Sequence, residues 1–220
     1  YSANDELYFI FGSSVANYVA YGDVVNLIAH PGYPGNQASD IWDDIALVEL
    51  SGVYDAQTGQ PYSLAPIPLN TTTISGNWVG RELQMVGYGI TGTNQNDSGT
   101  KRTTDMPIYN YDQYFVFLYD ANESQNICSG DSGGAALYGS GSNWDLVGVN
   151  SFTFGNCESW DAGVSRVYQY ISWIQIYVDD LGVVAEPSSE PSSEPSQPSS
   201  EPSQPSSEPS QPSSEPSQPS

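Results

Sequence analysis

The sequence is poor in positive charge, since its 220 residues include only four Lys and Arg against 26 Asp and Glu. The resulting formal net charge of −22 at pH 7 repels the phosphate backbone of nucleic acids and anionic lipid surfaces. We therefore expect no nucleic-acid partner and no attraction to an anionic membrane. The acidity suits a secreted protein.

Histidine and cysteine are also scarce, with one His and two Cys in the chain. These side chains do not supply the cluster of nitrogen and sulfur ligands that a zinc site needs, so we expect no metal and no cofactor, although the many carboxylates leave a structural Ca²⁺ open. Two cysteines are compatible with one disulfide in an oxidising compartment or with two free thiols.

Long apolar runs and an N-terminal targeting segment are absent as well. No stretch is apolar enough over 18 or more residues to predict a spanning helix, and we expect no membrane insertion. The chain begins at Tyr1 without an initiator methionine or a signal peptide. We interpret it as a processed product or as an incomplete chain.

Short runs of aromatic and β-branched residues, separated by Gly, Pro and Ser, predict a structure made mostly of strands. The runs lie at 7–11, 18–21, 24–29, 83–88, 106–109, 114–118, 135–138, 145–151 and 163–167. A polar connector with three prolines covers about 51–75. Helical spacing of apolar residues is convincing only from Tyr168 to about Leu181, with Gly182 just after it. The pattern indicates an all-β barrel class with one C-terminal helix.

The end of the chain, from Glu186 onward, consists almost entirely of Pro, Ser, Glu and Gln, and E-P-S-Q-P-S-S repeats in it every seven residues. Such a segment cannot bury enough apolar area to fold, and its prolines favour extended polyproline II backbone. We predict a disordered tail over 184–220. Tails of this composition usually separate a folded domain from a further module or a surface anchor.

The stretch with the most specific chemistry is N-I-C-S-G-D-S-G-G-A-A-L, from Asn126 to Leu137. It places Ser132 between glycines, and acyl transfer needs a sharply turned backbone that exposes such a hydroxyl. The backbone N–H groups of Gly130 and Ser132 can form an oxyanion hole for the attacked carbonyl. A glycine-rich turn that carries an incidental serine is the alternative interpretation.

Five segments, in matching order, resemble those of the chymotrypsin/trypsin family of serine endopeptidases. They are D-I-A-L at 44–47, V-G-Y-G at 86–89, C-S-G-D-S-G-G at 128–134, V-G-V-N-S-F-T-F-G-N-C at 147–157 and A-G-V-S-R-V-Y-Q-Y-I-S-W-I at 162–174. The resemblance covers about residues 20 to 180 and implies a fold of two β-barrels. Since residues 1–50 can supply only about three of the six strands of a first barrel, we expect a partial first barrel with its connector (1–70), then a second barrel with the C-terminal helix (71–183).

The resemblance also implies roles for the residues that would carry out catalysis. Ser132 is the nucleophile, and Asp44 is the aspartate that orients the catalytic base. Asp43, beside it, is the rival for that role. Asp131 is the partner of an N-terminal ammonium group that zymogen cleavage would release.

Substrate binding and the cysteines are interpreted in the same way. The strand Ser151, Phe152 and Thr153 would pair with a protein or peptide substrate. Asn126 matches the floor of the primary specificity pocket, with Thr153 and Gly163 as its walls, which favours neutral substrate side chains of small to medium size. A loop-capping amide is the other interpretation of Asn126. Cys128 and Cys157 match a disulfide between the nucleophile loop and the pocket wall, which implies a secreted protein.

The catalytic base is the missing part of this assignment. His30 is the one histidine of the chain, but it matches an H-P-x-Y segment shortly before the triad aspartate and not the motif that carries the base. We interpret it as a histidine at the end of a surface strand.

Two functions remain, with a third less compatible with the motifs. The chain is an N-terminally truncated trypsin-like serine endopeptidase, inactive by itself without its base, or it is a base-less homologue that binds without cutting. We favour truncation, because the intact nucleophile loop, aspartate and cysteine pair are what an active enzyme carries. A surface stalk protein would require the Ser132 motif to be accidental.

Overall fold

The computed structural model describes residues 7–35, 40–122, 124–155, 157, 161–179 and 181 of the chain. Contacts divide the chain into the units Tyr1–Val184 and Ala185–Ser220. All of the second unit lies outside the described residues, and the predicted disordered tail therefore does too.

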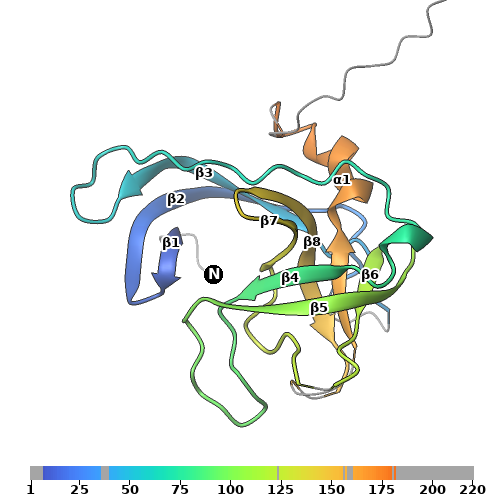
Figure 1. Cartoon of the computed structure of the whole chain (residues 1–220). Helices are drawn as coiled ribbons and strands as arrows, with labels where there is room; N and C mark the ends of the chain where they lie inside the picture. The colour runs from blue at the N-terminus through green and yellow to red at the C-terminus, as the bar shows by residue number, and fades with distance from the viewer. Residues whose placement is uncertain are drawn as a thin grey trace, which may run out of the picture. The chain divides into compact units, whose positions relative to one another are not determined.

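The first part of the chain forms a three-stranded antiparallel sheet in the order β1-β2-β3 (Figure 1). Its strands are β1 (Tyr8–Ser14), β2 (Asn17–Ala29) and β3 (Ala46–Asp55). The sequence predicted two separate strands at 18–21 and 24–29, and this was wrong. Gly22 pairs with both β1 and β3, and Asp23 pairs with β1. Register shifts around Val24 bend the strand without ending it.

The second part forms a closed barrel in the order β4-β5-β6-β9-β8-β7. Its strands are β4 (Glu82–Gly87), β5 (Arg102–Tyr111), β6 (Phe115–Leu118), β7 (Ala135–Ser140), β8 (Asn143–Thr153) and β9 (Ala162–Arg166). A short 3₁₀ helix, η1 (Gly76–Trp78), precedes the barrel. Closure pairs every strand on both sides, so the barrel has no free edge. The predicted all-β class is confirmed.

Alternating apolar side chains fill this barrel. Burial along β4 changes from residue to residue, as a strand with one inward face requires. The side chains that are at most 1% exposed include Leu83, Met85, Met106, Ile108, Val116, Leu118, Ala136, Val147 and Val164. Each larger one contributes about 1.5 to 3 kcal/mol through burial, so the barrel has a continuous core.

The C-terminal helix α1 (Val167–Ile174) packs where the first sheet meets the barrel (Figure 1). Its buried face shares a cluster with Ile45 and Leu47 near the start of β3 and with Leu146 and Val149 of β8. The helix is shorter than predicted, because the chain continues after Ile174 in hydrogen-bonded turns. Among the described residues, no helix has the length and apolar character to span a membrane.

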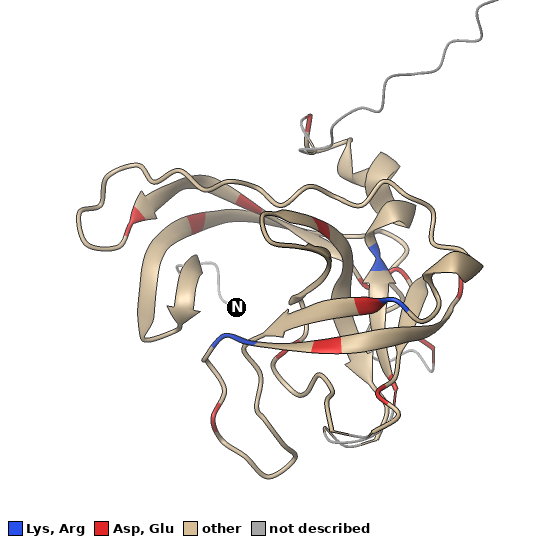
Figure 2. Cartoon of the chain, in the orientation of Figure 1, with Lys and Arg blue, Asp and Glu red and all other residues tan. Residues whose placement is uncertain are grey.

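The first sheet contrasts with the barrel, because many of its large apolar side chains are exposed. Between 41% and 59% of the surface is accessible at Tyr8, Phe9, Val15, Tyr18, Val19, Val25, Leu27 and Val48. Acidic positions occur on strands of both sheets, while Lys and Arg are few (Figure 2). The first sheet thus has the apolar residues of a barrel wall without a closed barrel around them.

Candidate active site

The loop between β6 and β7 exposes Ser132 on a tight turn. The N–H of Asp131 donates to the carbonyl of Cys128 at 3.0 Å, and the N–H of Gly134 donates to the carbonyl of Asp131 at 2.9 Å. Gly130 and Gly133, on either side, have φ angles of 94° and 80°, which side chains other than glycine rarely adopt. The turn therefore lifts the serine hydroxyl out of the barrel, as the sequence pattern predicts for a nucleophile.

The backbone N–H groups of Gly130 and Ser132 point to no acceptor in the described part of the chain. The neighbouring N–H of Gly133 is used differently, because it donates to the carbonyl of Asn150 at 2.9 Å. That bond, together with the N–H of Asn150 donating to the carbonyl of Gly134 at 2.9 Å, ties the loop to β8. Two N–H groups beside an exposed serine remain available to a developing oxyanion.

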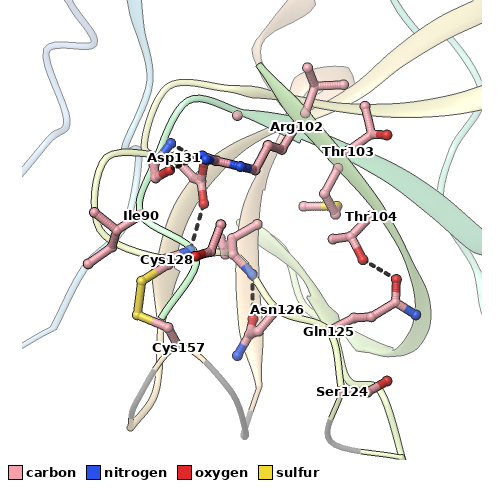
Figure 3. A pocket seen from close by; sticks show the side chains of 16 residues that line it. Ile90, Arg102, Thr103, Thr104, Ser124, Gln125, Asn126, Cys128, Asp131 and Cys157 are labelled. Atoms are coloured by element: carbon pink, nitrogen blue, oxygen red, sulfur yellow. Dashed lines mark hydrogen bonds between the residues drawn. A yellow bond between two sulfur atoms is a disulfide. The ribbon is translucent and has the colours of Figure 1, made fainter. Parts of the chain in front are cut away.

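The carboxylate of Asp131 turns inward from the same loop (Figure 3). Its Oδ1 accepts from the N–H of Gly89 and its Oδ2 from the N–H of Cys128, each at 2.7 Å. A Cβ on Gly87 or Gly89 would overlap this carboxylate, so glycine at both positions makes room for it. Charge-assisted hydrogen bonds of this kind hold the loop firmly.

A cavity of about 210 Å³ lies beside this carboxylate. Asp131, Ile90, Arg102, Asn126 and the Cys128–Cys157 disulfide are among the residues that line it (Figure 3). The Cα atoms of the two cysteines are 4.8 Å apart. The predicted cysteine pairing is confirmed.

Arg102 is a residue of this cavity that the sequence analysis did not single out. Its guanidinium donates to the carbonyl of Gly89 at 3.0 Å and to Oδ2 of Asp97 at 3.1 Å. Hydrogen bonds from the N–H and hydroxyl of Thr91, with the positive charge of Arg102, keep the pKa of Asp97 below its usual value. Arg102 thus braces the Gly89 segment against which Asp131 is held, and the scarcity of cations in the sequence was the signal that could have identified it.

Asp44 lies in the segment just before β3 and is held from the barrel. The hydroxyl of Ser151 donates to its Oδ2 at 2.5 Å, and the hydroxyl of Ser165 donates to its backbone carbonyl at 2.6 Å. Ser151 follows Asn150, which bonds to the nucleophile loop. The structure therefore brings Asp44 and the Ser132 loop to the same end of β8.

His30 lies at the end of β2 and faces Asp43 and the helix α1. Its Nδ1 accepts from the N–H of Gly32 at 3.2 Å and lies 3.5 Å from Oδ2 of Asp43. Its ring packs edge-on against Tyr170 and Trp173 of α1. In the described part of the chain, its polar contacts do not include Asp44 or Ser132.

Two of the predicted pocket residues meet directly. The side-chain amide of Asn126 donates from Nδ2 to Oγ1 of Thr153 at 3.0 Å. Thr153 is paired with Ala162 on the neighbouring strand, and directly paired residues point to the same face of a sheet. Ala162, which the sequence analysis did not name, therefore shares the face of Thr153.

The third predicted pocket residue, Gly163, faces a different side chain. It is paired with Phe152, and a Cβ on Gly163 would overlap the ring of Phe152. That ring also packs edge-on against Phe115 and Phe154. The structure thus places Gly163 against the ring of Phe152, another residue predicted to contact the substrate.

A closed β-barrel packed beside a second sheet, with an exposed serine on a glycine turn and an aspartate held near it, defines the class of chymotrypsin-like serine proteases. The chain matches the family model described as Trypsin over residues 7–174, which is more than half of its length. It belongs to the trypsin family.

Three curated relatives are similar to this chain. CLIP domain-containing serine protease B10 of Anopheles gambiae is 30% identical over an alignment of 162 residues, and the alignment covers 67% of this chain and 42% of that protein. CLIP domain-containing serine protease B4 of Anopheles gambiae is 26% identical over an alignment that covers 70% of this chain and 46% of that protein. Vitamin K-dependent protein C of Mus musculus is 23% identical over 73% of this chain and 38% of its own.

The chain therefore spans less than half the length of these curated relatives. Among solved structures, it is similar to neuropsin, a serine protease expressed in the limbic system of mouse brain, with a TM-score of 0.57 and 21% identity over 71% of each chain. This likeness confirms the predicted chymotrypsin-like fold.

Proposed function

We propose that this chain is the C-terminal part of a secreted trypsin-like endopeptidase that hydrolyses peptide bonds through an acyl-enzyme on Ser132. The observation that carries the proposal is the arrangement around Ser132. Ser132 is exposed, and the N–H groups of Gly130 and Ser132 have no acceptor in the described chain. The carboxylate of Asp44 is held by Ser151, near the end of β8. Since the chain would lack its base, we propose that it is inactive by itself.

The proposed reaction follows from these positions. The Ser132 hydroxyl attacks the scissile carbonyl carbon as a histidine base takes its proton, and the N–H groups of Gly130 and Ser132 bind the oxyanion. The intermediate collapses to an ester as the leaving amine receives that proton. Water, deprotonated by the same base, then attacks the ester and releases the acid and free Ser132. Asp44 stabilises the imidazolium form of the base throughout.

A base supplied by chain upstream of these residues is supported by two findings. His30 is occupied by Gly32, Asp43 and α1, so it is poorly placed to serve Ser132. The first sheet has three strands and exposed apolar side chains, as expected of a barrel that further strands complete. Those strands would bring the base.

The cavity beside Asp131 supports a role in activation. We propose that it receives the ammonium group of a new N-terminus, which would pair with the Asp131 carboxylate. A cavity of about 210 Å³ has room for a terminal apolar residue, and Ile90 gives it an apolar wall. Such a pairing would stabilise the nucleophile loop after cleavage of a precursor.

The substrate class follows from the hydrogen bond between Asn126 and Thr153. In a primary pocket built on these residues, the bond would cross the space for a substrate side chain, and Asn126 at the floor carries no charge to pair with Arg or Lys. We propose a preference for small, neutral side chains next to the scissile bond. Secretion is supported by the disulfide, which persists in oxidising compartments.

The second candidate function is that of a homologue that binds proteins without cutting them, which the contacts of the one histidine with Gly32, Asp43 and α1 favour. Two measurements on the protein purified from its source separate the candidates. Its N-terminal sequence and intact mass show whether a second histidine lies upstream. Labelling of one sample by a fluorophosphonate probe, and hydrolysis of labelled casein by a second sample without the probe, show whether Ser132 is reactive.

The endopeptidase proposal expects labelling that Ser132→Ala abolishes, and casein hydrolysis that the same change abolishes. Ser129→Ala is the matched control, because Ser129 is an exposed serine of the same loop and its loss should leave labelling intact. A protein with no second histidine, no labelling and no hydrolysis would overturn the proposal in favour of the binding homologue.

A further inference from the structure

Asp43 has an unusual backbone conformation for its residue type. With a φ of 51°, it is the one residue other than glycine that has a positive φ in the described part of the chain. Asp and Asn tolerate this left-handed region better than other side chains. Asp43 immediately precedes Asp44, so its backbone sets the direction in which the chain enters Asp44.

The carboxylate of Asp43 accepts one hydrogen bond and faces the ring of His30. Oδ1 accepts from the hydroxyl of Tyr170 at 3.1 Å, and Oδ2 lies 3.5 Å from Nδ1 of His30. Gly32 makes room for this arrangement, since a Cβ there would overlap Oδ2 of Asp43. The side chain is 18% exposed, so these contacts form away from bulk water, where they are stronger.

Tyr170 fixes the cluster to the helix. It is 4% exposed and packs in the cluster that contains Ile45 and Trp173. Burial first, and then the negative charge and the hydrogen bond of Asp43, raise the pKa of Tyr170 well above its ordinary value. Its hydroxyl therefore stays protonated and remains a hydrogen-bond donor to Asp43.

Asp44 is thus held from two sides. Ser151 and Ser165 bind it from the barrel, whereas the side chains of Tyr170 and His30 contact its neighbour Asp43. We infer that Asp43 is a positioning residue, whose hydrogen bond from Tyr170 and contact with His30 aim the carboxylate of Asp44. The catalytic part of this inference rests on the proposed function.

Three substitutions at one position separate the side chain from the backbone. Asp43→Asn keeps an oxygen for Tyr170, places an amide donor opposite His30 Nδ1 and tolerates the left-handed backbone. Asp43→Gly adopts the backbone without strain but removes the bond from Tyr170 and the contact with His30. Asp43→Ala removes both and also strains the backbone. Glu49→Gln is the control, because it removes one charge from the exposed Glu49 of β3.

The first measurement is kcat and KM for a peptide ester, using the whole natural protein. We expect Asp43→Gly and Asp43→Ala to lower kcat by about 10- to 100-fold, because small displacements of a catalytic group cost rates of this order. KM should change less than twofold, since Asp43 would not touch the substrate. Asp43→Asn should restore kcat to within about threefold of the wild type, and Glu49→Gln should match the wild type. A full kcat in Asp43→Gly would overturn the inference, because the backbone conformation alone would then suffice.

The second measurement does not depend on activity. Crystal structures of the variants should show the Asp44 carboxylate bonded to Ser151 in Asp43→Asn and displaced from it in Asp43→Gly. An Asp44 that stays on Ser151 in both variants would overturn the inference. If the wild-type protein cleaves nothing, the proposed function fails, and these structures still decide whether Asp43 positions Asp44.

Discussion

The ring of Phe152 lies where a side chain on Gly163 would stand, so the two residues fit each other across the β8–β9 pair. Phe115, on β6, and Phe154 pack against the same ring. A larger residue at 163 must therefore displace Phe152 from this aromatic cluster.

We predict that Gly163→Ala lowers the free energy of unfolding by about 1 to 3 kcal/mol, the usual cost of overpacking a filled site. Urea unfolding followed by tryptophan fluorescence measures it. Gly76→Ala is the control, because a Cβ on Gly76 meets open space. Equal stability of the wild type and Gly163→Ala would show that Phe152 does not need the space above Gly163.

The hydrogen bond from Ser151 to Asp44 gives a prediction for activity. In the whole protein, Ser151→Ala should lower kcat by about 10- to 100-fold, because a hydrogen bond to a charged group contributes about 1.5 to 3 kcal/mol. Peptide-ester kinetics measure this loss. Ser140→Ala, at the exposed end of β7, should leave kcat unchanged. An unchanged kcat in Ser151→Ala would mean that Ser165 alone is enough to hold Asp44.

The packing of Phe152 on Gly163 and the bond from Ser151 to Asp44 show which features could be predicted from the sequence alone. The nucleophile motif and the cysteine pair are local patterns whose chemistry requires particular residues, and they were predicted by residue number. The strands of the barrel were predicted from short runs of aromatic and β-branched residues. Gly163 was assigned to a pocket wall by resemblance, whereas its pairing with Phe152 depends on the strand register, which a local pattern does not give.

The remaining misses have the same origin in long-range contacts. The sequence treats Gly22 as a break, yet pairing with β1 and β3 on both sides keeps the strand continuous there. Arg102 donates a hydrogen bond to Gly89, and Tyr170 donates one to Asp43, and neither partner is a neighbour in the sequence. No local pattern identifies such partners, because they meet only after the barrel and helix have packed.

The bond between Asn126 and Thr153 predicts a change in substrate preference. Thr153→Gly removes the acceptor and the branched side chain, which should widen the pocket. In the whole protein, we expect kcat/KM for a Phe peptide to rise roughly tenfold relative to an Ala peptide, the scale of discrimination for a few carbon atoms in a pocket. Thr93→Gly, at an exposed position of the loop between β4 and β5, should not change this ratio. A ratio that stays constant in Thr153→Gly would place the specificity pocket elsewhere.

Asp120, in the loop that leads to Asn126, predicts a dependence of stability on pH. It accepts hydrogen bonds from the N–H of Asn122 at 3.0 Å and from the N–H and hydroxyl of Ser124 at 3.0 and 2.8 Å. These bonds lower the pKa of Asp120 in the folded protein. The folded state therefore binds this proton less tightly than the unfolded state does. The stabilisation is present above the ordinary carboxyl pKa of about 3.9 and is lost as the pH falls through the lower folded value.

Urea unfolding at pH 7, 4 and 2.5 tests this in the wild type and in Asp120→Asn. We expect the wild type to be the more stable at pH 7 and the difference to shrink as the pH falls to 2.5, because protonation of the aspartate removes the charge that these bonds stabilise. Asp145→Asn is the control, since Asp145 lies in β8, outside this loop. A difference between the wild type and Asp120→Asn that does not depend on pH would show that shape, and not the charge of Asp120, holds the loop before the nucleophile.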